Sequence, residues 1–192
     1  MALVMIAAPA AEPISVAEAK AHLRIDADDE DALIASLIVT ATTFVEKALA
    51  RALITQDWSL YLDAWPRDGT IALPLAPVQE VTAVRVYDSG DMPTDVDEES
   101  YSVDTVSEPA RLALSASGMQ LLPARLLNAY EVAFTTGYGD EADDVPEPIR
   151  HALKLLVAHW FERREPVVLG EAPQEVPATV ASLLLPYRQV RL

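Results

Sequence analysis

Residues 135–164 constrain the fold of this chain more than any other stretch, because they pass from a strand to a helix within a few residues. An alternating apolar segment ends at Thr136, and a Gly-Tyr-Gly turn and an acidic spacer follow it. Pro146 and Pro148 then stand where a helix begins, since the first turn of a helix does not use the N–H that proline lacks. Apolar side chains recur beyond them at helical spacing: Ile149, Ala152, Leu153, Leu156, Trp160 and Phe161. We therefore predict a strand ending at Thr136 and an amphipathic helix from about residue 147 that buries these side chains, Trp160 included.

Three further helices are predicted from capping residues and apolar spacing. Ser15 followed by Glu18 is a capping box, which starts a short helix that ends near Leu23. Residues 29–50 form a long amphipathic helix, with acids in its first turn and a lysine near its end, as the helix dipole favours. Its apolar positions are Leu33, Leu37, Ile38, Ala41, Val45, Ala48, Leu49 and Ala52. A last short helix is expected over residues 177–185.

The middle of the chain, residues 54–136, changes from the helical to the alternating period that is typical of strands. Four segments show the alternation most clearly, around Leu60, Val84, Val103 and Val132. Breaks at proline and glycine divide the region into five or six short antiparallel strands. Residues 88–99 carry six acids with a glycine and a proline, which predicts a solvated loop. The expected class is therefore α+β.

Composition limits what such a chain can do. Its 192 residues, 51% of them hydrophobic, are enough for one domain with a real core, so we expect a single domain over residues 1–192. The formal charge of −16 repels phosphate backbones, which argues against a nucleic-acid reader. The sequence contains no cysteine, which excludes disulfides, thiolate chemistry and zinc sites built on cysteine.

The N-terminal residues 1–15 are apolar but lack the features of a targeting segment. Their apolar run of about eight residues has no early lysine or arginine and is far shorter than the roughly 20 residues of a membrane span. We expect a soluble protein made in the cytoplasm. Two interpretations of the arm stay open: a flexible terminus, or an apolar strand that docks on a neighbouring subunit.

The acidic and histidine residues do not predict a metal site. Residues 26–31 begin like an EF-hand loop, but Asp31 stands where the loop needs glycine and Leu37 where it needs a bidentate glutamate. The acids of residues 140–147 are read as a solvated loop, which becomes a weak cation site only if neighbouring subunits converge there. The three histidines, His22, His151 and His159, do not have a zinc-ligand spacing.

No catalytic or cofactor-binding motif is present in the sequence. The Ser89-Gly90 and Ser117-Gly118 pairs lack the nucleophile elbow of a serine hydrolase. The Gly-Tyr-Gly turn lacks the third glycine of a dinucleotide fingerprint, and the acids after it would repel a pyrophosphate. We therefore predict that the chain is not an enzyme and holds no cofactor and no metal.

Two groups of residues are candidates for protein contacts. Asp143 and Asp144 could form ion pairs with Arg163 and Arg164, in the same chain or in the next one. We take these four residues as a candidate subunit interface. The C-terminal tail, residues 186–192, is the locally basic and aromatic end of an acidic chain. It is either a frayed terminus or a docking peptide, and its candidate docking residues are Tyr187, Arg188, Arg191 and Leu192.

Taken in order, these segments resemble one protein family. The opening PISVAEAKAHLRI with its acidic step, the block TTGYGDEADDVPEPIRHALKLLVAHWFERRE and the terminal LLLPYR are similar to the gp6-like head–tail connector (adaptor) proteins of tailed siphophages and gene transfer agents. In the opening, the resemblance rests on Ser15, Glu18, Ala19, Lys20, Leu23, Arg24, Ile25 and the acids of residues 28–31.

The resemblance implies a fold and a set of partners. The fold is mainly a helical bundle, with helices at about residues 15–50 and 147–185, that carries an inserted antiparallel β region at about residues 54–136. Copies assemble as a ring, about twelve-fold, between the portal of the capsid and the stopper or tail proteins. The C-terminal segment engages the portal, and DNA passes through without sequence-specific binding. The particle, at its head–tail junction, is the implied location.

The charge suits such a ring, because an acidic wall offers DNA no site to stick to as it slides past. A small acidic protein-binding module that does not assemble into a ring is the alternative hypothesis, and an unrecognised enzyme is a third. An enzyme would need a pocket with convergent reactive side chains, and the sequence identifies none.

Overall fold

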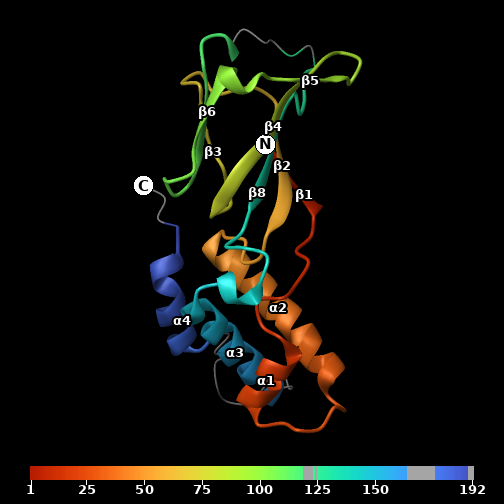
Figure 1. Ribbon diagram of the computed structural model, residues 1–192, viewed down its shortest axis with the longest axis vertical. Coiled ribbons are helices and arrows are strands. Elements are labelled where there is room, and N and C mark those ends of the chain that lie inside the picture. The colour runs from red at the N-terminus through yellow and green to blue at the C-terminus, as the bar shows by residue number, and fades with distance from the viewer. Residues whose placement is uncertain (119–122, 124, 164–175, 190–192) are drawn as a thin grey trace, which may run out of the picture. The chain divides into compact units, whose positions relative to one another are not determined.

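The computed structural model describes residues 1–118, 123, 125–163 and 176–189 (Figure 1). These residues form two compact units, each built from two separate segments of the chain. The β unit comprises Met1–Ala10 and Thr55–Tyr138, and the helical unit comprises Ala11–Ile54 and Gly139–Leu192.

The β unit contains a five-stranded antiparallel sheet in the order β1-β2-β8-β4-β5. Its strands are β1 (Ala2–Ala7), β2 (Gln56–Leu62), β4 (Val78–Tyr87), β5 (Pro93–Asp95) and β8 (Tyr130–Thr136). The register places Leu3, Leu60, Val132 and Val84 in one row across four strands. Side chains alternate between the two faces of a strand, so this row and its neighbours give the sheet one apolar face.

A second, three-stranded sheet contributes to the same core. Its order is β3-β7-β6, and its strands are β3 (Thr70–Ala72), β6 (Tyr101–Asp104) and β7 (Arg111–Leu114). A single-turn helix, η1 (Glu98–Ser100), precedes β6. Buried residues of both sheets form one cluster, which includes Leu60, Leu62, Ile71, Leu73, Val84, Leu112, Val132 and Phe134. The β region therefore has a hydrophobic core of its own.

The N-terminal arm is a strand of this sheet, so the flexible-terminus interpretation is wrong. Ala2 to Met5 pair in antiparallel register with Tyr61 to Trp58 of β2. The arm is thus held within its own chain. Because the sheet ends at β1, the outer edge of this strand faces away from the other strands (Figure 1).

The helical unit contains the predicted helices with small shifts at their ends. They are α1 (Val16–Leu23), α2 (Asp31–Leu49), η3 (Ala142–Asp144), α3 (Glu147–Glu162), α4 (Ala178–Leu184) and η4 (Leu185–Tyr187). Helix α3 contacts α1, α2 and α4. The core of the unit consists of apolar residues from these helices: Ile34, Ile38, Val45, Leu49, Ile149, Leu153, Leu156, Val157, Val180 and Leu184.

Local sequence signals start the helices as predicted. The Ser15 hydroxyl accepts from the N–H of Glu18, and the Glu18 carboxylate accepts from the N–H of Ser15, which completes the capping box of α1. Pro148 occupies the first turn of α3. The prediction for Trp160 is only partly right, because its side chain is half-buried, with its ring edge-on to Phe44 at a centroid distance of 6.0 Å.

The prediction of a mainly helical bundle is wrong. Of the described residues, 35% are helical and 27% lie in strands, arranged as four α-helices and two antiparallel sheets. Between Gln56 and Thr136 the described residues form seven strands rather than five or six, because β5 lies within the segment expected to be a loop. The reason is that the β strands, joined by the N-terminal strand, bury their own apolar face instead of depending on the helices.

Candidate functional site

Arg150, in the first turns of α3, gathers charged groups of the helical unit around one guanidinium group. Its Nη2 lies 2.6 Å from Glu18, and its Nη1 lies 2.9 Å from Asp143 and 3.2 Å from Glu147. Its Nε donates to the backbone carbonyl of Pro13 at 3.2 Å. Because the side chain is only 12% exposed, these partners compensate for the water that the charge has lost.

Glu18 serves both the cap of α1 and this cluster. The pKa of Glu18 lies below its usual 4.5, first because the N–H of Ser15 donates to the carboxylate. The hydroxyl of Ser15 and the charge of Arg150 lower it further, against the opposing effect of burial. The PISVAE opening therefore positions a carboxylate that fastens α1 to α3.

The residues of the candidate subunit interface lie at opposite ends of α3. Asp143 and Asp144 precede the helix, and the Asp144 carboxylate accepts from the N–H of Glu141 at 3.0 Å. Arg163 is the exposed C-cap residue, and Arg164 lies outside the described residues. A helix of 16 residues is about 24 Å long, so the two acids cannot reach Arg163 along the same helix. Within the chain, Asp143 pairs with Arg150 instead.

The Gly-Tyr-Gly sequence is a structural turn, as expected, at the point where the chain leaves the β unit for the helical unit. Gly137 has a φ of 135°, which side chains rarely tolerate. A Cβ on Gly139 would collide with the carboxylate of Asp144. The two glycines are therefore required by backbone conformation and by close packing.

Neither the acidic residues nor the histidines form a metal cluster. In residues 1–118, 123, 125–163 and 176–189, no group of three or more His, Asp or Glu side chains could hold a metal ion. Asp28 and Asp31 pair with the ammonium of Lys20 at 2.5 and 2.8 Å. His22 and His151 lie edge-to-face with 6.1 Å between ring centroids, a pairing across two helices that sequence spacing did not reveal.

The candidate docking tail begins as part of the folded helical unit. Pro186 lies inside η4, which continues directly from α4. The Nε of the buried Arg51 donates to the carbonyl of Tyr187 at 2.7 Å. Leu185 and Arg188 are exposed, whereas Arg191 and Leu192 lie outside the described residues.

Sequence reasoning missed a polar cluster on the face of the five-stranded sheet opposite its core. Register places Tyr61, Glu131, Arg85 and Asp95 in one row across four strands. The buried Glu131 carboxylate accepts from the hydroxyls of Ser59 at 2.7 Å and Tyr87 at 2.6 Å. Its place between alternating apolar residues of β8 was the available signal.

The pKa values in this cluster follow from burial and from the shared carboxylate. Burial raises the pKa of Tyr87 to about 12, and the hydrogen bond and charge of Glu131 add to this effect. Burial alone would also raise the pKa of Glu131, but the hydrogen bonds from Tyr87 and Ser59 and the charge of Arg85 outweigh it and leave the pKa below 4.5. Glu131 is thus a stable anion that holds three strands in register.

Comparison with known proteins finds one matching family and several solved structures with a similar architecture. Residues 12–190 match the sequence profile of the family described as head completion protein. Among curated proteins, no sequence matches the chain significantly. Solved structures similar over the whole chain include "Neck of empty GTA particle computed with C6 symmetry", with a TM-score of 0.83 and 28% identity over 97% of that chain. "Virion of native gene transfer agent (GTA) particle" has a TM-score of 0.83 and 27% identity, and "Neck of native GTA particle computed with C12 symmetry" has 0.79 and 28%, each over 97% of that chain.

The family match and the structural likeness agree. The profile spans the helical unit and the β unit alike, and the structural matches cover 100% of the chain. The sequence resemblance noted in the opening, the Gly-Tyr-Gly block and the C-terminal segment is therefore confirmed at the level of the whole chain. This chain belongs to the head completion protein family.

Proposed function

We propose that this head–tail connector works as a closed ring of about twelve copies in the neck of a phage-like particle. The observation that carries the proposal is the match of the entire chain to neck structures of gene transfer agent particles. One of those necks was computed with twelve-fold symmetry and one with six-fold symmetry. Cyclic rings use two different surfaces of each copy, one for each neighbour.

The ring leaves a passage for DNA. A net charge of −16 on every copy gives the assembly an acidic character that repels phosphate. The wall therefore lets the duplex slide without holding it at any sequence. The partners we assign are the portal above the ring and a stopper or tail protein below it.

The portal contact is assigned to α4 and the residues after it. Residues 176–187 carry no charged side chain, and Leu185 is 65% exposed on their surface. Arg188 follows as an exposed cation, and Arg191 and Leu192 continue the segment outside the described residues. An apolar anchor beside arginine is the combination that binding hot spots favour. The pair Asp143 and Asp144 and the exposed Arg163 are assigned to contacts between copies, because the length of α3 keeps them apart within one chain.

A complementation experiment tests the proposal. Particles are produced in cells whose only source of the protein is a plasmid, with and without an intact reading frame, and tailed particles are counted by electron microscopy. We expect heads without tails when the protein is absent and normal particles when it is restored. Normal tailed particles without the protein would contradict the connector function.

A further inference from the structure

Within residues 32–45, the outer face of α2 is unusual for an acidic protein because it carries no charge. Charged residues make up 23% of the chain, so residues 32–45 would contain about three at that frequency, yet they contain none. Only a third of the helix is buried, and its composition and length would even suit a membrane span. The exposed residues of this stretch are Ala32, Ser36, Val39, Thr40, Thr43 and Phe44, and the exposed Lys47 lies beyond it in the last turn.

The two threonine hydroxyls on this face already donate within the helix. The Thr40 hydroxyl donates to the carbonyl of Ser36 at 2.8 Å, and the Thr43 hydroxyl donates to the carbonyl of Val39 at 2.9 Å. Val39 is 51% exposed and Phe44 is 38% exposed. The face thus offers methyl groups and an aromatic ring to a partner and has no free charge to desolvate.

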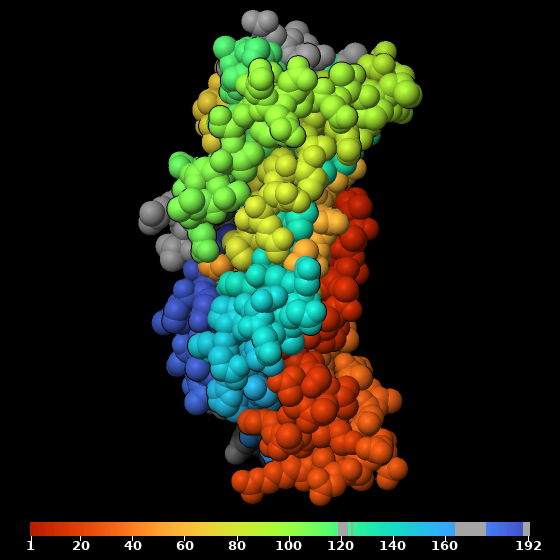
Figure 2. Space-filling view, viewed as in Figure 1, coloured from red at the N-terminus to blue at the C-terminus, as the bar shows by residue number. Residues whose placement is uncertain are grey.

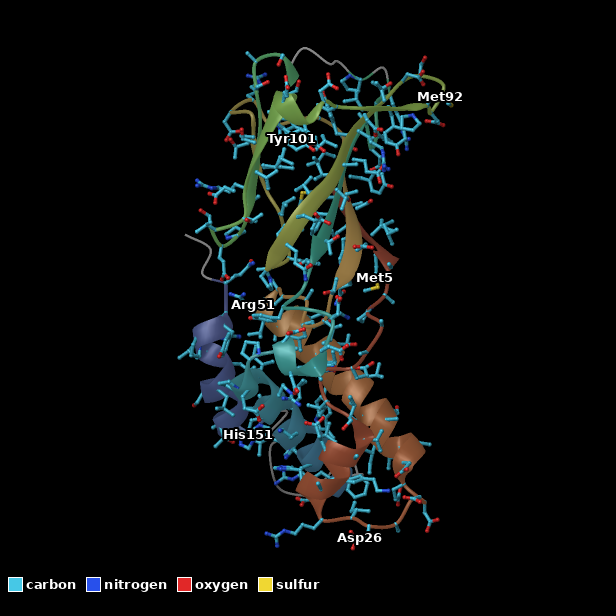
Figure 3. All side chains as sticks on the ribbon, in the orientation of Figure 1. Met5, Asp26, Arg51, Met92, Tyr101 and His151 are labelled. Carbon is cyan, nitrogen blue, oxygen red and sulfur yellow. The ribbon has the colours of Figure 1, made fainter. Side chains whose placement is uncertain are left out.

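A second charge-free surface lies on β1. Residues 1–11 carry no charged side chain, and β1 ends the five-stranded sheet with an unpaired backbone edge. Val4, Met5 and Ile6 are 44%, 42% and 61% exposed. Figure 3 labels Met5 on this strand. The other edge strand, β5, is three residues long and contains a proline and an aspartate, which protect a sheet edge. The β1 edge lacks such protection, which indicates that something covers it.

The net charge identifies the occupant of these surfaces as another copy of the chain. Two copies with a charge of −16 repel each other, so surfaces that bring no acidic side chains together favour their contact. A ring needs two different surfaces that meet this condition on every copy. In the part of the chain that the structure describes, α2 and β1 each offer such a charge-free surface, and both reach the molecular surface (Figure 2).

We propose that the charge-free face of α2 in one copy covers the free edge of β1 in the next copy, an inference that rests on the ring proposed above. A helix laid along an edge strand shields its backbone groups, and the apolar side chains of both elements pack in the contact. Because the two surfaces differ, each copy uses both, and the contact propagates around the ring until it closes.

Cross-linking in assembled particles tests this contact, because the chain has no cysteine of its own. Particles are made with a Val39→Cys, Ile6→Cys variant, treated with a short bis-maleimide and analysed by denaturing electrophoresis with detection of this chain. We expect a ladder of cross-linked copies with the double variant, and monomers with either single variant. The control is Val106→Cys with Ile6→Cys, since Val106 is 93% exposed and outside both surfaces, and it should stay monomeric.

The other outcomes overturn the inference. Dimers from Val39→Cys alone would show that α2 contacts α2 of the next copy. A cross-link to another particle protein would show that the surface binds that protein instead. An unlinked double variant that is present in the particles at normal amounts would refute the contact while leaving the proposed ring in place.

A charge placed on the face gives a second test. We expect Val39→Glu to be absent from particles while its melting temperature stays unchanged, and the matched Val106→Glu to be incorporated normally. Val39→Glu incorporated at normal levels would contradict the proposal. Purified wild-type protein that sediments with phosphatidylcholine vesicles, with Val39→Glu failing to do so, would reassign the face to a membrane and overturn the proposal.

Discussion

At the scale of single residues, Arg150 and Glu131 organise the two units through partners that are distant in sequence. Arg150 contacts Glu18 and Pro13, which precede it by 132 and 137 positions. Glu131 accepts from Ser59, 72 positions away. Sequence analysis could identify the Ser15 cap of Glu18 because it is local, but it could not predict these clusters, because they exist only after helices and strands have packed.

Removing Arg150 should destabilise the helical unit. We expect Arg150→Ala to lower the free energy of unfolding by about 2 kcal/mol, because hydrogen bonds to charged groups are lost and Glu18 keeps a poorly compensated charge. The measurement is urea unfolding of the purified protein. The control is Arg163→Ala, an exposed position that should change stability by less than about 0.5 kcal/mol. Equal effects of the two substitutions would show that the cluster contributes nothing specific.

Glu131 should make stability depend on pH. Its folded pKa is lowered from 4.5, so its contribution is fully present above that value and is lost as the pH falls through the folded pKa. The difference in melting temperature between wild type and Glu131→Gln should therefore be large at about pH 7 and shrink by about pH 3. The exposed Glu99→Gln is the control and should show little difference at either pH. A difference that does not change with pH would contradict the role of the anion.

At the scale of elements, local sequence signals predicted where most helices and strands lie. They did not predict how these elements pack together. The capping box of α1, the prolines of α3 and the alternation around Leu60 and Val132 placed most helices and strands correctly, because each depends on neighbouring residues. The strand β1 was left between two interpretations, since nothing in its apolar run names β2 as its partner. The bundle expectation failed for the same reason: periodicity does not tell which elements share a core.

The last turn of α3 should contribute less to the stability of the protein than the middle of the helix. Leu156 is fully buried, so Leu156→Ala should cost about 3 kcal/mol through lost transfer energy and a cavity. Trp160 is half-buried against Phe44, so Trp160→Ala should cost only about 1–2 kcal/mol. Denaturant unfolding of both variants checks the order. A larger loss for Trp160→Ala would place its side chain in the core after all.

Two truncations separate the fold of the tail from its function. Ending the chain before Pro186 removes the Tyr187 carbonyl that Arg51 binds, so the melting temperature should fall. Ending it after Gln189 keeps that bond, so the melting temperature should stay the same. Both should yield heads without tails if the tail contacts the portal. Normal tailed particles from the shorter deletion would show that residues 190–192 are not needed for docking.

At the scale of the whole molecule, the distribution of charge connects the chain to its assembly. A net charge of −16 keeps the outside of each copy acidic, whereas residues 1–11, 32–45 and 176–187 carry no charged side chain. We assign the first two stretches to neighbouring copies and the third to the portal. The charge that suits the passage of DNA is thus absent from three stretches that we assign to protein contacts.

Electron microscopy of intact particles that contain this protein is the most direct test of the central claim. We expect a closed ring of about twelve copies at the head–tail junction, and subunit density that fits the two antiparallel sheets and four α-helices. Particles that carry the protein but show no annular density for it at that junction would contradict the account.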